Sequence, residues 1–175
     1  MKVISFGELT AEEKKEIYKA FVRFHKEHGT MQKLKKTGMS LSWFEHRQDH
    51  TPVHYIFVEI IWAQLRQHYL DAKELKMVET SIKASIELIK FAEQFYHSKN
   101  KKIRWIGHYS ILGEFDFVFN QVSNLSTKDL ESCPTILKEE FRELWLLHKD
   151  VTALGNGWFP FHTITDKHKD FFPDR

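Results

Sequence analysis

Hydrophobic side chains recur at helical spacing along most of the chain. The first clear helix start is formed by Thr10 and Glu13, residue types whose side chains exchange hydrogen bonds with the backbone of a first turn. An apolar stripe follows, made of Ile17, Phe21, Phe24 and His28. Gly29 marks the expected end. The pattern predicts a first helix between Thr10 and Gly29.

Two longer helices are predicted next. Ser42 is the expected cap of a short helix across Trp43–Asp49, and Thr51-Pro52 is a typical start for a helix that reaches about Leu70. This second helix is apolar on most of its circumference, which is typical of a helix covered on several sides. The following segment, Lys73–His97, carries an unbroken heptad stripe formed by Leu75, Val78, Ile82, Ser85, Ile89, Ala92 and Tyr96.

The second half of the chain continues the helical pattern. A helix is predicted over about 103–122, although alternate aromatic residues at 115, 117 and 119 also fit a strand. The last long helix is expected to begin after Ser126 or Thr127 and to end at Gly155. Pro134 lies inside this segment, so its main part is expected to begin near Cys133, after a separate turn.

These segments predict an all-α fold: a single helical, bundle-like domain over residues 1–175 with about five main helices. Residues 156–175 are expected to pack on the bundle as an irregular tail. That tail is rich in aromatic residues, namely Trp158, Phe159 and Phe161. The low content of Gly and Pro, with seven and four residues, argues against a turn-rich β protein and against disorder.

The composition limits the partners and the cellular location that we expect for this protein. A net charge of +2 is too small to indicate nucleic acid as the partner. Cys133 is the only cysteine, which excludes an internal disulfide and favours a reducing compartment. Early glutamates interrupt any secretory signal, and no apolar run has the length of a membrane span. We therefore expect a cytoplasmic protein without a membrane partner.

Side chains that can bind a metal ion or transfer a proton are most concentrated in the run from Trp43 to His54. Its histidines recur every four residues, at His46, His50 and His54, with Asp49 between them. Imidazole and carboxylate groups on one face of a helix suit a divalent metal ion. Because Pro52 interrupts the run, the alternative is a set of exposed or helix-capping histidines. The spacings of zinc proteases and of di-iron bundles are absent.

Glu59 is the second candidate in this region. It lies within the most apolar helix, so we expect a carboxylate with little access to water and either a raised pKa or a partner. A structural ion pair with another element and a functional acid are both open, and Glu59 is included among the candidate metal ligands.

A partial family resemblance covers residues 97–154. The run from His97 to Leu112, with Trp105-Ile-Gly-His-Tyr109 inside it, resembles the region around the haem-ligating histidine of sensor-type globin domains. Leu144–Asp150 is similar to the last helix of that family. The resemblance implies a globin-like packing and His97 as a haem ligand, and a relative of the same fold without haem is equally allowed.

Two function classes follow from these observations. The first is a non-catalytic binding, sensing or protein-interaction module, which holds haem, another small hydrophobic ligand or a protein partner. The second is a metal-dependent enzyme of helical-bundle type that uses the His46, His50 and His54 cluster. Because no catalytic motif is present, the first class is favoured, and whether the chain is an enzyme stays open. A homodimer is also compatible with the sequence.

Overall fold

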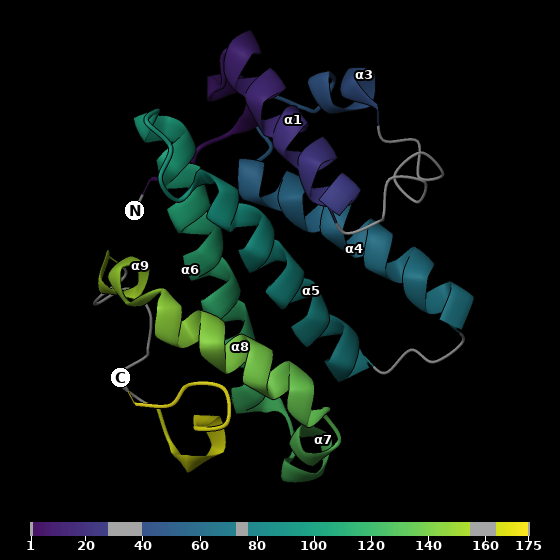
Figure 1. Cartoon of the computed structure of the whole chain (residues 1–175), viewed down its shortest axis with the longest axis vertical. Helices are drawn as coiled ribbons and strands as arrows, with labels where there is room; N and C mark the ends of the chain where they lie inside the picture. The colour runs from purple at the N-terminus through teal and green to yellow at the C-terminus, as the bar shows by residue number, and fades with distance from the viewer. Residues whose placement is uncertain (1, 28–39, 73–76, 155–163, 175) are drawn as a thin grey trace. The chain divides into compact units, whose positions relative to one another are not determined.

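The protein is all-α, as the spacing of its hydrophobic residues predicted (Figure 1). The computed structural model describes residues 2–27, 40–72, 77–154 and 164–174. Within these ranges, the pairing of extended backbone is limited to one isolated bridge between Ser5 and Pro52. No helix of this part of the chain is long and apolar enough to cross a membrane.

The chain divides into two compact units, each with its own core. Unit 1 consists of Met1–Glu74 and Phe91–Tyr109, and unit 2 consists of Leu75–Lys90 and Ser110–Arg175. Two helices, α5 (Met77–Ala92) and α6 (Lys101–Asn124), contribute residues to both units. The prediction of a single domain over residues 1–175 stays a prediction.

Unit 1 contains η1 (Phe6–Glu8), α1 (Ala11–Glu27), α3 (Leu41–Glu45), α4 (Val53–Ala72) and η2 (Glu93–Phe95). The predicted start of α1 is confirmed, because the Thr10 hydroxyl accepts from the Glu13 amide and the Glu13 carboxylate accepts from the Thr10 amide. Ser40, and not Ser42, caps α3: its hydroxyl accepts from the amide of Trp43 at 3.1 Å. The expected stop at Gly29 lies outside the described residues.

Aromatic rings from four α-helices and one 3-10 helix fill the interior of unit 1. Phe21 of α1 stacks on Phe91 at the end of α5, with ring centroids 4.1 Å apart, and meets the edge of Phe57 of α4 at 5.5 Å. Phe44 of α3 and Phe95 of η2 extend the cluster. All five rings are at most 2% exposed, so short helices are held in place mainly by aromatic burial.

Gly107 allows one close approach in this unit. A Cβ at this position would lie 2.9 Å from Cβ of Phe95 and 3.0 Å from the carbonyl oxygen of Ala92. The start of α6 therefore packs directly against the chain at the end of α5 and η2. This contact gives a structural reason for a glycine within a helix, where it otherwise reduces stability.

Unit 2 is built from α5 and the second part of α6, with α7 (Thr127–Glu131), α8 (Thr135–Leu147), α9 (Lys149–Leu154) and η4 (Asp166–His168). The last predicted helix is divided as Pro134 indicated: Ser126 caps α7, and α8 follows Pro134. Residues 115–119 lie in α6, so the strand alternative is wrong. Gly155 and the aromatic residues Trp158, Phe159 and Phe161 lie outside the described residues.

The core of unit 2 is formed where α6, α8 and the C-terminal segment meet. Phe115 of α6 contacts Phe141 and Trp145 of α8 with perpendicular rings. Phe171 and Phe172, near the end of the chain, are 1% and 0% exposed. The end of the chain is thus part of the hydrophobic core, and the charged residues around it do not keep it in solvent.

Candidate functional site

The predicted metal-binding histidines lie at the entry to α4, where the turn before Pro52 separates them. His46 ends α3 and is exposed, and its Nδ1–H donates to the carbonyl of Ser42 at 2.6 Å. His50 is exposed in the turn. His54 lies on the first turn of α4, half-buried, with its ring 6.1 Å from that of Tyr109. The four-residue spacing therefore does not extend along one continuous helix.

Asp49 contacts the N-terminal segment of the chain. Its carbonyl accepts from the amide of Gly7 at 2.9 Å, and a Cβ on Gly7 would lie 2.7 Å from Cβ of Asp49. The amide of Phe6 donates to the carbonyl of Thr51 beside it. These contacts attach the first residues of the chain to the turn that precedes α4.

The expectation that the Glu59 carboxylate has little access to water is wrong. Its side chain is 58% exposed, although its helix is rich in apolar residues, because the buried side of α4 lies opposite Glu59, at Phe57 and Ile61. The predicted ion pair exists: Arg47, which lies over the ring of Trp43 at 3.6 Å, approaches Glu59 to 3.7 Å. An exposed pair of this kind contributes little to stability and does not hold a buried acid.

Metal binding gains no geometrical support from this arrangement. Across the described ranges, no group of three or more His, Cys, Asp or Glu side chains is placed to hold a metal ion. The assignment of His46, His50, His54, Asp49 and Glu59 as ligands stays a prediction.

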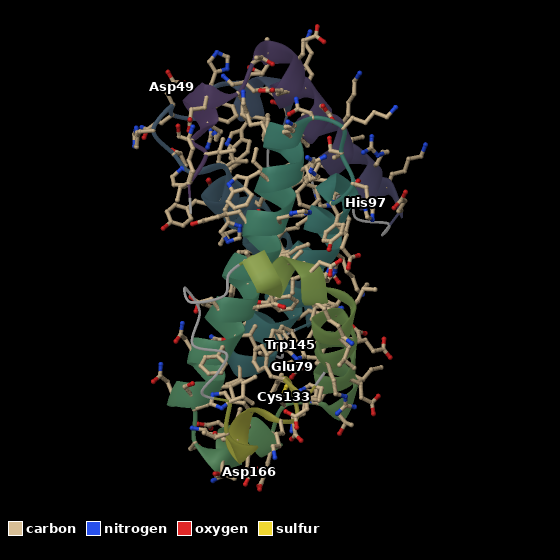
Figure 2. All side chains as sticks on the ribbon, turned by 90° about the vertical axis from the view of Figure 1, so that its left-hand side faces the viewer. Asp49, Glu79, His97, Cys133, Trp145 and Asp166 are labelled. Carbon is tan, nitrogen blue, oxygen red and sulfur yellow. The ribbon has the colours of Figure 1, made fainter. Side chains whose placement is uncertain are left out.

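His97, the predicted haem ligand, is exposed just after η2. Its ring meets that of Tyr96 nearly at right angles, with centroids 4.8 Å apart, and His108 approaches the same tyrosine. Figure 2 shows His97 and Asp49 well apart in unit 1, so the two predicted sites are separate. The globin resemblance and its haem ligand stay predictions.

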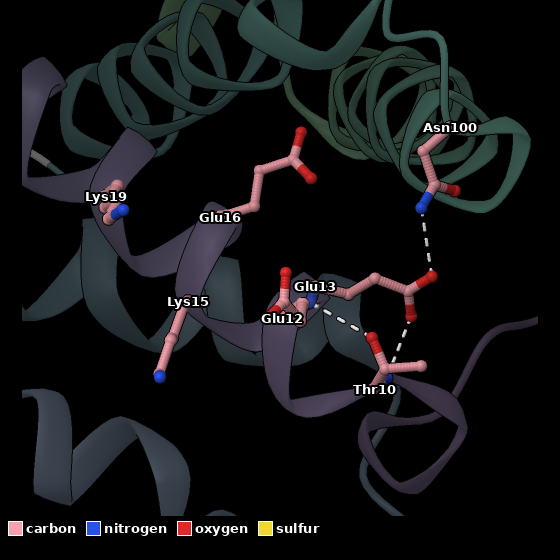
Figure 3. Close-up of a pocket in the computed structure, with 7 residues that line it drawn as sticks. All are labelled: Thr10, Glu12, Glu13, Lys15, Glu16, Lys19 and Asn100. Atoms are coloured by element: carbon pink, nitrogen blue, oxygen red, sulfur yellow. Dashed lines mark hydrogen bonds between the residues drawn. The ribbon is translucent and has the colours of Figure 1, made fainter.

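A polar groove of about 630 Å³ opens beside the first turns of α1 (Figure 3). It is lined by Thr10, Glu12, Glu13, Lys15, Glu16, Lys19 and Asn100. The Glu13 carboxylate accepts from Asn100 Nδ2 at 3.0 Å and pairs with Lys102 at 2.9 Å. Burial raises the pKa of Glu13, but the hydrogen bonds from Asn100 and Thr10, together with Lys102, lower it overall. The most strongly bonded carboxylate of the groove therefore joins α1 to the start of α6.

The interior of unit 2 contains a polar pair that the sequence did not suggest. Ser85 of α5 donates from its hydroxyl to the carboxylate of Glu114 of α6 at 2.8 Å. The two residues are 1% and 5% exposed. A hydrogen bond of this kind fixes the mutual register of two helices, because its loss leaves polar groups in an apolar interior.

The most distinctive surface belongs to α8. Its core side is formed by Leu137, Phe141, Leu144 and Trp145. The opposite side combines apolar and acidic side chains, and we define it as the α8 outer face: Ile136, Glu139, Glu140, Glu143, Leu146 and Leu147. Ile136 and Leu147 are 64% and 68% exposed, and Leu146 is 38% exposed. Three of the six large hydrophobic side chains exposed in the described residues therefore gather on one helix.

Sequence reasoning did not identify the α8 outer face. The sequence pattern predicted a helix across this region and gave Ile136 and Leu147 no role. Two aliphatic residues away from the core stripe of an amphipathic helix are a signal that is visible in the sequence.

Known proteins give no further guide to the site, because no family model, no curated protein and no solved structure matches the chain.

Proposed function

We propose that this protein is a non-catalytic protein-interaction module and that its α8 outer face binds a cationic amphipathic helix of another protein. The observation that carries the proposal is the clustering of exposed aliphatic side chains on that face. Single exposed hydrophobic residues are ordinary on protein surfaces, but a group of them bordered by polar residues is typical of an interaction site.

The spacing on α8 suits a helical partner. Positions 136, 140, 143 and 147 are separated by four, three and four residues, so their side chains lie along one side of the helix. The exposed aliphatic residues at its two ends, Ile136 and Leu147, are about 16 Å apart along the axis, or about three turns. An amphipathic helix commonly binds through apolar side chains distributed over this length.

The charges on the same face indicate the chemistry of the partner. Glu139, Glu140 and Glu143 lie between the aliphatic positions, and one basic residue, Arg142, borders the face beside Leu146, so acidic side chains predominate. Lys90 of α5 approaches Glu140 to 3.7 Å from one side. A second copy bound through the same face would bring these carboxylates together, and juxtaposed like charges oppose association. A helix with lysine or arginine beside its apolar stripe complements the face.

The proposal is tested with a synthetic helical peptide that has leucine on one side and lysine on the other. Fluorescence anisotropy of the labelled peptide with the full chain should show saturable binding that weakens with salt. Leu147→Asp should weaken it about tenfold or more, because it replaces an apolar contact at the end of the face by a carboxylate that would lose its water against the apolar stripe of the peptide. Val3→Asp, a change at an exposed residue of unit 1, is the matched control and should leave binding unchanged.

A second peptide, with glutamate in place of every lysine, distinguishes binding through complementary charge from non-specific hydrophobic binding. Equal binding of both peptides, or equal binding by Leu147→Asp and the unchanged protein, would rule out the α8 outer face as a site for a cationic helix. Sedimentation should show a monomer. A dimer that Leu147→Asp dissociates would instead assign the face to a second copy.

A further inference from the structure

The C-terminal segment, residues 164–174, is attached to the rest of unit 2 by aromatic packing and hydrogen bonds. Phe171 and Phe172 insert against Phe141 of α8, with ring centroids 5.9 and 5.3 Å away. Trp145 donates from its indole N–H to the carbonyl of Pro173 at 3.0 Å. Figure 2 labels one residue on each side of this attachment: Trp145 of α8 and Asp166, near the start of the segment.

His168 lies at the centre of this attachment. It is 5% exposed, and its ring stacks on that of Phe119 of α6 with centroids 4.2 Å apart and planes 4° from parallel. Its backbone carbonyl accepts from the amides of both Phe171 and Phe172. The position of this one residue therefore determines the position of the two buried phenylalanines.

The hydrogen bonds of the imidazole define its protonation state. The backbone amide of Thr165 donates to Nδ1 at 3.2 Å, so Nδ1 is an acceptor and has no proton. The remaining proton lies on Nε2, which is 2.8 Å from the hydroxyl oxygen of Ser123. That hydroxyl in turn donates to the carbonyl of Phe119 at 2.9 Å. The Thr165 hydroxyl also lies 3.0 Å from Nδ1 and can donate to it, so the observed hydrogen bonds suit a neutral imidazole.

From this geometry we propose that His168 is an acid-sensitive latch, which holds the C-terminal segment on unit 2 while it is neutral and releases it when it is protonated. A proton on Nδ1 would place two N–H donors opposite each other at the Thr165 amide and remove that hydrogen bond, and the Thr165 hydroxyl would have to turn from donor to acceptor. It would also bury a positive charge at a residue that is only 5% exposed. Release would expose the rings of Phe119, Phe141 and Trp145.

The charged groups around the latch do not compensate for that proton. Lys167 lies next to His168 and donates to the carbonyl of Ser123 at 2.9 Å. Of the three carboxylates in the described segment, Asp166 pairs with Lys169 at 2.9 Å and Asp170 with Lys138 of α8 at 3.5 Å. The third, Asp174, interacts electrostatically with Lys169. From α6, the side chains that contact the imidazole are Phe119 and Ser123, and neither is charged.

The direction of the pH effect follows from these surroundings. Burial lowers the pKa of His168 below its ordinary value of 6.5, and the charge of Lys167 lowers it further. A histidine with a lowered pKa in the attached state stabilises attachment above pH 6.5, and this stabilisation is lost as the pH falls below that value. The equilibrium for attachment should weaken by up to about tenfold per pH unit in this range.

Hydrogen exchange of the full chain, read by mass spectrometry and corrected for the intrinsic effect of pH, tests the latch. Between about pH 7.5 and about pH 5, the protection of the amides from Thr165 to Phe172 should fall about tenfold or more. The amides of Ile82–Ile89, in the buried part of α5 in the same unit, should keep their protection. The groove beside α1 and the α8 outer face are not involved, so the outcome is independent of the proposed function.

Two variants complete the experiment. His168→Gln retains polar atoms but does not take up a proton, so its segment should show lower protection that no longer changes with pH. His97→Gln, at an exposed histidine of unit 1, should retain the pH response of the unchanged protein. The latch is overturned by unchanged protection of the segment at low pH, by an equal fall in His168→Gln, or by a parallel loss of protection in α5.

Discussion

The interiors of the two units differ in chemistry. Nine polar or charged residues are buried in the described part of the chain; His25 belongs to unit 1 and the other eight belong to unit 2. Unit 1 is filled by aromatic rings, whereas unit 2 combines its rings with the Ser85–Glu114 pair and with His168. Apart from His25, the first interior depends mainly on shape and area, and the second depends also on hydrogen bonds between buried side chains.

This difference has a physical consequence for how each unit responds to change. Burial of apolar rings stabilises a fold without preferring any protonation state. A buried hydrogen bond contributes less on average, but its loss leaves a polar group without compensation, and a buried imidazole changes its charge near neutral pH. Unit 1 should therefore be sensitive to the loss of volume, and unit 2 should be sensitive also to the loss of single polar atoms.

The largest expected effect is the removal of a ring from unit 1. Phe21→Ala should reduce the free energy of unfolding by about 3–5 kcal/mol, because Phe21 contacts Phe57 and Phe91 and is 2% exposed. Urea denaturation followed by circular dichroism measures the change. Phe117→Ala, at a residue that is 39% exposed, is the control and should have a much smaller effect. A loss below about 1 kcal/mol at Phe21 would contradict the packing described for unit 1.

A smaller effect is expected from the polar interior of unit 2. Ser85→Ala removes the hydroxyl that donates to Glu114 and leaves a buried carboxylate with one hydrogen bond fewer, at a cost of about 1–3 kcal/mol. The free energy of unfolding measures it, with Ser42→Ala, at an exposed residue of unit 1, as the control. If both changes have the same small effect, the buried polar pair does not distinguish the two interiors.

The smallest effect concerns the surface of unit 1. Because the pKa of Glu13 is lowered in the folded state, its charge stabilises the fold above about pH 4.5, and this contribution is lost as the pH falls below that value. Glu13→Gln should therefore reduce stability by about 0.5–1 kcal/mol near neutral pH and by less in acid. Thermal unfolding across this range measures the change, with Glu12→Gln as the control; a constant difference at all pH values contradicts the assignment.

Much of the helical organisation was predictable because it depends on neighbouring residues. The capping pair at Thr10 and Glu13 and the interruption at Pro134 act within one turn, so their effect is present in the sequence itself. Ser40 was missed as the cap of α3 because Ser42 is an equally suitable residue type two positions later. Capping residues identify a helix start only to within a few positions.

The burial of individual side chains was less predictable. Glu59 was expected to be shielded from water because its sequence neighbours are apolar, yet it lies on the side of α4 that other elements leave exposed. Phe171 and Phe172 are preceded by a charged stretch, yet both are buried. Burial depends on which elements meet, and the apolar content of a segment does not specify its contacts.

The helical character of the chain and the starts of most of its helices follow from the sequence, since hydrophobic period, capping residues and proline act over one or two turns. Which residues share a site depends on the tertiary structure. It separated His46 and His50 from His54, placed Ile136 and Leu147 on an exposed face, and brought Ser123 of α6 to within 2.8 Å of His168 near the end of the chain. Such contacts join residues far apart in sequence, and side-chain packing fixes their geometry.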